Sequence, residues 1–172
     1  MATQRQGQSI ESFHVKSAAL YGVAAYIAGL AATIVFLAVF VDSFDFDVFG
    51  IGATFFGAHN VSVGNGFMSL NVLNRLTTEY GSLELLWAVP PVLLAGAGKM
   101  FAETRAGRSL GPEEMDGAKA GALVAGGYAV LAVAGTFVFT EGETSAELVE
   151  TLLYMGIVYP VVFGGIGGYL SR

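Results

Sequence analysis

The sequence contains no cysteine and few charged residues. Its 172 residues include 8 Lys and Arg, 14 Asp and Glu and 2 His, and charged side chains make up 13% of the chain, against roughly 25% in soluble domains. Without cysteine there is no disulfide, no thiolate metal ligand and no thiol nucleophile. Because phosphate binding needs clustered basic residues and the net charge is −6, we expect no nucleic-acid partner.

The charges are missing mainly from long apolar stretches. A helix needs about 20 apolar residues to cross a hydrocarbon core roughly 30 Å thick. Three uncharged stretches meet that length, at 17–41, 120–140 and 151–171. A fourth, 85–98, reaches about 20 residues when Glu84 lies at the interface and Lys99 extends toward water. The sequence therefore predicts an all-α membrane protein, a four-helix bundle in the lipid bilayer that forms one domain over residues 1–172. We place the spans at 17–41, 83–102, 117–140 and 150–170.

The basic residues predict the orientation of the four spans. With a cytoplasmic amino terminus, seven of the eight basic residues lie in the cytoplasm and only Arg75 lies outside, which is the usual positive-inside asymmetry. The seven are Arg5, Lys16, Lys99, Arg105, Arg108, Lys119 and Arg172. A fifth span over 48–70 would move three of them outside, so we reject it. We expect a multi-pass protein of the cell membrane with both termini in the cytoplasm.

The segment 42–81 is predicted to be an exterior loop. Its part 48–74 carries no charge, and its many glycines disfavour a continuous helix. Two short runs of alternating apolar and polar residues flank Asn65-Gly66, a pattern that predicts a β-hairpin. Left in water, the loop's phenylalanines would expose an apolar patch of the kind that marks a protein or membrane contact. We therefore expect an ordered loop that packs either on the outer ends of the helices or on a partner chain, with Phe55, Phe56 and Phe67 as the candidate partner contacts.

Four residues in or beside the spans are candidates for a functional role. Glu84 is either a proton or cation site at the outer mouth of the bundle, or an acid that reaches water at a helix start. Pro90, Pro91 and Pro160 remove backbone donors and are expected to kink or unwind their helices. Such breaks form transport sites in some membrane proteins and are simple bends in others.

Two glycine motifs predict close helix packing. Gly117-x-x-x-Gly121 and Gly164-x-x-x-Gly168 have the spacing that lets two helix backbones approach each other. The contact lies either between helices of one bundle or between two copies of the chain. The sequence alone leaves both alternatives open.

The residue pattern excludes the common catalytic and metal-binding sites. His14 and His59 lie far apart in the predicted topology, and neither is followed by a second ligand three or four residues later. The glycines at 164–168 lie inside a span, without the Lys and Ser/Thr of a phosphate-binding loop. We predict no catalytic residue, no cofactor and no metal ion, and we expect that the protein is not an enzyme.

The pattern resembles an uncharacterised family of four-helix membrane proteins from halophilic archaea. The features shared with that family are the 25-residue first span, the exterior segment 52–61, the cytoplasmic Arg105-x-x-Arg108 and the run Gly126-Gly127-Tyr128. An acidic net charge agrees with a salt-rich cytoplasm. The resemblance implies the architecture and brings no catalytic residue, because that family has no assigned activity.

Two functions fit these features. The first is a non-enzymatic structural or accessory subunit that binds a protein partner, or a second copy of itself, through the exterior loop. The alternative is a small channel or carrier for an ion or small solute, gated near one of the proline sites. Its expected lining residues are Thr33, Tyr128, Thr136, Tyr154 and Tyr159.

The predicted orientation is testable with cysteine labelling, since the chain has no native cysteine. A cysteine at Thr144 should react with a membrane-impermeant thiol reagent in intact cells, and one at Ser109 should not. The reason is that these positions fall on opposite sides of the third span. Labelling at Ser109 without labelling at Thr144 would reverse the topology.

Overall fold

Four long apolar helices dominate the structure. The computed structural model describes residues 2–42 and 47–172, with side chains from residue 14 onward, so residues 43–46 of the predicted exterior loop lie outside the described part. The helices that are long and apolar enough to cross a membrane are His14–Phe40, Gly81–Ala102, Glu114–Val138 and Leu148–Tyr169. The prediction of four such helices is confirmed, and their ends lie within three residues of the predicted ones. We call them the four candidate spans.

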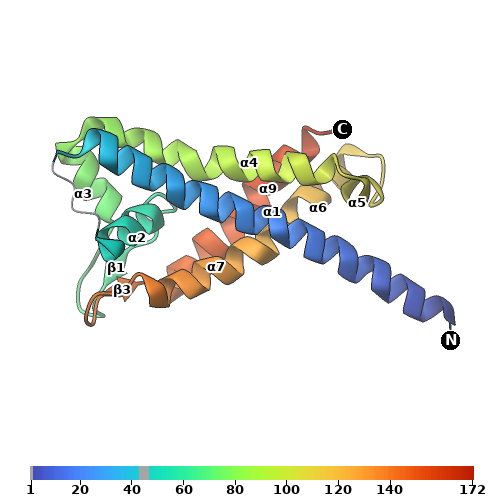
Figure 1. The fold of residues 1–172 in the computed structure, drawn as a ribbon, viewed down its shortest axis with the longest axis horizontal. Helices are drawn as coiled ribbons and strands as arrows, with labels where there is room; N and C mark the ends of the chain where they lie inside the picture. Colours follow the sequence, from blue (N-terminus) through green and yellow to red (C-terminus); the bar gives the residue numbers. More distant parts are fainter. Residues whose placement is uncertain (1, 43–46) are drawn as a thin grey trace.

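The first candidate span belongs to one continuous helix, and the other three are composite. Helix α1 (Ala2–Phe40) begins well outside the bundle, so that the amino terminus projects away from the other helices (Figure 1). The second span joins the 3₁₀-helix η1 (Gly81–Ala88) to α4 (Val89–Ala102), and the short α5 (Arg105–Arg108) follows it. The third contains α6 (Glu114–Ala122) and α7 (Ala125–Val138). The fourth contains α8 (Leu148–Glu150), the π-helix η2 (Thr151–Val158) and α9 (Tyr159–Tyr169).

The prolines stand where the helix type changes. Pro90 and Pro91 lie in the first turn of α4, directly after the 3₁₀-helix, and Pro160 lies in the first turn of α9, directly after the π-helix. A proline has no N–H to donate to the carbonyl one turn earlier, so the preceding turn adopts another hydrogen-bond pattern. The prolines were expected to disturb these two helices. In the second span Pro90 and Pro91 follow the tighter turns of a 3₁₀-helix, and in the fourth span Pro160 follows the wider turns of a π-helix.

Glycines bring α9 into close contact with α4 and α6. A Cβ atom on Gly121 would meet the carbonyl oxygen of Gly164, and one on Gly117 would meet that of Gly168. A Cβ on Gly98 of α4 would also meet the backbone of Gly164. The two glycine motifs thus face each other within one chain, where only a hydrogen atom fits between the backbones.

Helices α1 and α7 touch and then diverge. Cβ atoms on Gly22 and Gly127 would meet backbone atoms of the opposite helix, so these two helices are also in close contact. Beyond this contact α1 and α7 spread apart, and the teal helix α2 (Val48–Gly57) lies in the angle between them (Figure 1). The fold therefore has a closed end near the carboxyl terminus and an open angle that another segment fills.

Part of the predicted loop is helical. Besides α2, the helix α3 (Val72–Glu79) forms within residues 42–81. Asp47 caps α2, because its carboxylate accepts hydrogen bonds from the N–H groups of Phe49 and Gly50 at 2.9 and 2.7 Å. Most of α2 is buried, and this burial outweighs the low helix propensity of its glycines. The glycine content was therefore a poor guide to this segment.

The predicted hairpin is confirmed and gains a third strand. Strand β1 (Val63–Gly64) pairs antiparallel with β2 (Ser69–Leu70), around a turn in which Asn65 accepts hydrogen bonds from the N–H groups of Phe67 and Met68. On its other side β1 pairs with β3 (Ser145–Ala146), which precedes the fourth candidate span. The sheet order β2-β1-β3 joins two connections that lie far apart in the sequence.

The glycine contacts predict a strong position dependence of alanine substitutions. Gly121→Ala should lower the free energy of unfolding by about 1–3 kcal/mol, because the new methyl group overlaps the backbone of α9. Gly126→Ala is the matched control, since nothing lies within 4 Å of its Cβ position. Thermal unfolding in detergent compares them. Equal melting temperatures for the two variants would show that α6 and α9 have room to separate.

Candidate functional site

The segment 48–63, which we call the plug, fills the angle between α1 and α7. Phe55 and Phe56 are 0% exposed. The ring of Phe55 packs edge-on against Tyr26 of α1 at 5.1 Å, and Phe56 packs against Phe139 at the end of α7 at 6.1 Å. The helices of the same chain therefore cover Phe55 and Phe56, which is the first of the two alternatives predicted for the loop, and leave no surface of either ring for a partner. Of the three predicted residues, only Phe67 lies on the surface, at 96% exposure.

His59, directly after α2, is the polar centre of the plug. It is 0% exposed, and both ring nitrogens have partners. Nδ1 lies 2.8 Å from the carbonyl oxygen of Phe55, and Nε2 lies 2.6 Å from the hydroxyl of Tyr128 in α7. A carbonyl only accepts, so Nδ1 carries a hydrogen. In the neutral ring Nε2 is then the acceptor, and the Tyr128 hydroxyl donates to it.

The contacts of His59 lie halfway along the candidate spans. Tyr128 is 10 residues before the end of its span at Val138, about 15 Å at 1.5 Å per residue. This is about half of a hydrocarbon core of roughly 30 Å. Tyr159, whose ring centroid is 5.2 Å from that of His59, also stands near the middle of its span. The predicted loop therefore carries a titratable side chain to the middle of the bundle.

Electrostatics favour the neutral form of His59. Burial lowers its pKa to about 4, although the hydrogen bond with Phe55 offsets part of this effect. The aromatic rings of Phe55, Tyr128 and Tyr159 surround the imidazole. Within the described residues the ion pairs are Lys99–Glu103 and Lys119–Asp116, and neither involves this site. The side chain therefore sits in an apolar pocket with two hydrogen bonds and no counter-ion.

Further hydrogen bonds fix the plug on both sides of His59. Asn60, in a left-handed conformation with φ of 60°, turns the chain back and donates to the Tyr159 hydroxyl at 2.9 Å. The N–H of Ser62 donates to the Glu150 carboxylate at 2.7 Å, and the Ser62 carbonyl accepts from the N–H of Glu147 at 2.9 Å. The fourth span therefore binds the plug at two depths.

The residues predicted to line a channel have other roles. Thr33 donates to the Gly29 carbonyl at 3.0 Å and Thr136 donates to the Val133 carbonyl at 2.7 Å, so both hydroxyls bond to their own helices. Tyr128 and Tyr159 bind the plug, and Tyr154 is 37% exposed on the outside of the bundle. The space between these residues is occupied by the chain itself.

Glu84 lies apart from this site. It is exposed on η1, among the first residues of the second candidate span. The glycine and proline candidates also shape the helices rather than surround a ligand site. No group of three or more His, Asp or Glu side chains that suits a metal ion occurs in the described part of the chain. Of the residues named from the sequence, the structure gathers Phe55, Tyr128 and Tyr159 around His59.

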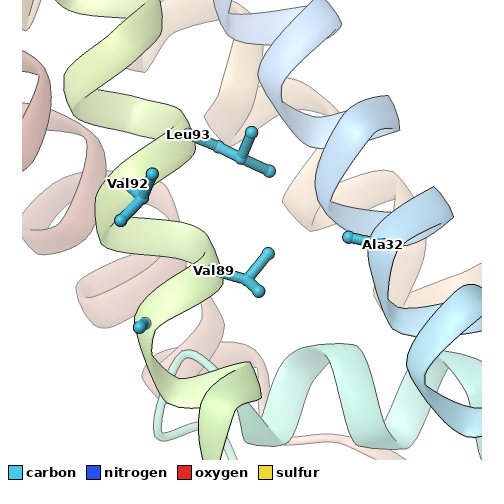
Figure 2. A pocket seen from close by; sticks show the side chains of 5 residues that line it. Ala32, Val89, Val92 and Leu93 are labelled. Carbon is cyan, nitrogen blue, oxygen red and sulfur yellow. The ribbon is translucent and has the colours of Figure 1, made fainter.

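An apolar crevice lies between α1 and α4. Figure 2 shows Val89 and Leu93 of α4 facing Ala32 of α1 across it. Ala88 and Val92 complete the lining, and the volume is about 240 Å³. All five residues are apolar, so the walls offer no side-chain hydrogen bond to a ligand. Hydrocarbon is the chemistry that suits such a surface.

The hairpin tip carries the most exposed apolar side chains. Phe67 is 96% and Met68 80% exposed, and Leu70 on β2 is also exposed. Behind the tip a hollow of about 250 Å³ is lined in part by Phe49, Val63, Met68 and Leu70. The strands on either side of β1 hold this surface on a fixed base. The hairpin tip thus places exposed apolar side chains beside a hollow in the protein surface.

Sequence reasoning missed the role of His59 and Asn60, which it assigned to the backbone of a loop. The available signal was their position inside 27 uncharged residues, 48–74, rich in phenylalanine. Such a segment needs to be covered, and a polar pair within it needs buried partners. The identity of those partners, Tyr128 and Tyr159, depends on how the helices pack and is not visible in the sequence.

The hydrogen bond between Tyr128 and His59 predicts a cost for removing one hydroxyl. Tyr128→Phe should lower the free energy of unfolding by about 1–3 kcal/mol, because Nε2 loses its donor in a buried place. Tyr154→Phe makes the same chemical change at a side chain that is 37% exposed, and should have little effect. Denaturation in detergent measures both variants, and equal stability would mean that the buried nitrogen has found another donor.

The comparisons with known proteins identify a family and no activity. No curated protein and no solved structure matches the chain. One family model, described as a family of unknown function (DUF7978), matches residues 1–172. This agrees with the resemblance to an uncharacterised family. Since the match covers the whole sequence, the chain belongs to DUF7978, a family of unknown function.

Proposed function

We propose that this protein is a non-enzymatic structural or accessory subunit of the cell membrane that binds another protein through the tip of the β1–β2 hairpin. The observation that carries the proposal is the exposure of Phe67, at 96%, and of Met68, at 80%, on an anchored turn. Four long apolar helices support insertion in a membrane. The acidic composition supports a halophilic archaeal source.

The orientation of the tip follows from the positive-inside asymmetry. The hairpin lies in the connection after α1, and in the proposed topology this connection faces the exterior while both termini are cytoplasmic. The residues around the tip are uncharged from 48 to 74. A partner surface for it should therefore be apolar at the centre, with polar groups that meet Asn65 and Ser69 at the edge.

The energetics favour a protein partner for this tip. Burying a side chain such as Phe or Met contributes about 1.5–3 kcal/mol, and aromatic side chains are enriched among the residues that dominate binding energy. The sheet and the Asn65 turn hold Phe67 and Met68 in place before binding. Little conformational entropy is then lost on association.

A channel or carrier has less support. The plug occupies the middle of the bundle, and the threonine hydroxyls that would line a path bond to their own helices. Transport would require the plug to move. An accessory subunit that binds a partner through the hairpin tip requires no movement of the plug.

Crosslinking from the tip tests the proposal. Phe67→Cys introduces the only cysteine, so a short bifunctional thiol and amine reagent applied to native membranes should link the chain to one other polypeptide. Val149→Cys, at a site on α8 that is 77% exposed, is the control and should not give that product. Adding Met68→Ser should reduce the yield severalfold, because it removes part of the apolar contact.

The outcomes are distinct. A product that contains two copies of the chain would replace the proposed partner with self-association. The same product from both cysteine positions, or none from Phe67→Cys, would contradict a binding site at the tip.

A further inference from the structure

We propose that His59 is a proton-binding site that keeps the plug in the bundle while it is neutral and releases the plug when it takes up a proton. The proposal rests on the position of the imidazole, which is fully buried between α2 and α7 and bonded through both nitrogens. It concerns the isolated chain and does not depend on a partner at the hairpin tip.

Protonation conflicts with the observed hydrogen bonds. The neutral ring donates from Nδ1 to the Phe55 carbonyl and accepts at Nε2 from the Tyr128 hydroxyl. A proton added to Nε2 turns this nitrogen into a donor. The Tyr128 hydroxyl must then accept, and its own hydrogen must turn toward the surrounding aromatic rings. The added proton therefore reverses the hydrogen bond between Nε2 and Tyr128, takes the acceptor away from the Tyr128 O–H and buries a charge.

Among the residues that the structure describes, the groups around His59 offer no compensating charge. Phe55 of α2 and Tyr128 of α7 contact it directly, and Tyr159, at the start of α9, packs against its ring. Tyr26 of α1 reaches it through Phe55 and Tyr128. The carboxylate that binds the plug is that of Glu150, and it accepts from the backbone of Ser62 instead. A buried cation without a partner is strongly unfavourable.

The rest of the bundle does not need the plug for its helix contacts. Helices α4, α6 and α9 meet through glycines, and α1 meets α7 through Gly22 and Gly127. The plug adds apolar packing and a few hydrogen bonds, including that from Asn60 to Tyr159. Loss of the plug therefore opens the angle between α1 and α7 and leaves the glycine contacts in place.

The direction and range of the pH effect follow from linkage. An unburied histidine has a pKa near 6.5. Burial lowers the pKa of His59 to about 4 while the plug is held in the bundle, a state that we call docked. Docking is unaffected above pH 6.5, weakens as the pH falls from 6.5 to 4, and changes no further below 4. Over this window the ratio of docked to released plug should fall by up to about 300-fold.

A cysteine in the plug measures this ratio in the purified chain. Val61→Cys places a thiol at a position that is 0% exposed, and Phe67→Cys places one at the exposed tip as the reference. Reaction with dithiodipyridine, which modifies thiols at acidic pH, is followed in detergent between pH 7.5 and 4. The rate at position 61 relative to 67 should rise steeply below pH 6.5, and His59→Gln should remove that rise.

Two further variants separate His59 from other causes. Glu150→Gln should keep the pH dependence, because its carboxylate bonds to the Ser62 backbone and not to the imidazole. Tyr128→Phe removes the donor that favours the neutral ring, so it should move the transition to higher pH. This variant also tests the proposal if His59→Gln fails to fold.

The proposal is overturned by any of three results. These are a flat rate ratio across the pH range in the unmodified background, a pH dependence that survives His59→Gln but disappears in Glu150→Gln, and a transition that Tyr128→Phe leaves at the same pH.

Discussion

The hydrogen bond from the Tyr128 hydroxyl to His59 joins the long connection after α1 to the middle of the bundle. A polar group that is buried away from water must find its partner inside the protein. The plug can therefore enter the bundle only where its imidazole meets a donor and its Asn60 meets an acceptor. Tyr128 and Tyr159 supply both at the same depth. The path of the connection, the position of the hairpin and the burial of Phe55 all follow from this match.

The shape of the bundle explains why there is space for the plug. Glycines let the helices meet closely at the end of the bundle where the carboxyl terminus of the chain lies, and α1 and α7 diverge from their contact toward the other end. An empty angle between α1 and α7 would leave the aromatic side chains along it without packing partners. The plug provides those partners with Phe55 and Phe56. Because the glycine contacts hold the helices together at one end of the bundle, the helices diverge at the other end, where the plug fills the space between α1 and α7.

The sequence was informative where local physics decides the structure. Runs without charge located the four long helices, Asn65-Gly66 located the hairpin turn, and the prolines located the changes of helix type. It was misleading where packing between distant segments decides. Glycines that weaken an isolated helix became contact points inside α2. The phenylalanines were expected to be covered, but the sequence left open whether their own chain or a partner covers them.

The candidate site was out of reach for the same reason. His59 and Tyr128 are 69 residues apart, and β3 pairs with a strand some 80 positions earlier. No local sequence pattern predicts either of these long-range contacts. The number of long helices could be predicted, but not which connection returns into the bundle.

The π-helix η2 changes the phase of the fourth span. In a regular α-helix, residues at 3.6 per turn keep one face toward one neighbour, whereas a wider turn shifts everything after it by about one residue, or about 100°. Within η2, Gly156 faces Ala129 of α7. After it, Gly164 and Gly168 face α6. A single helix can in this way present two different stripes to two different neighbours, as a straight α-helix of the same sequence could not.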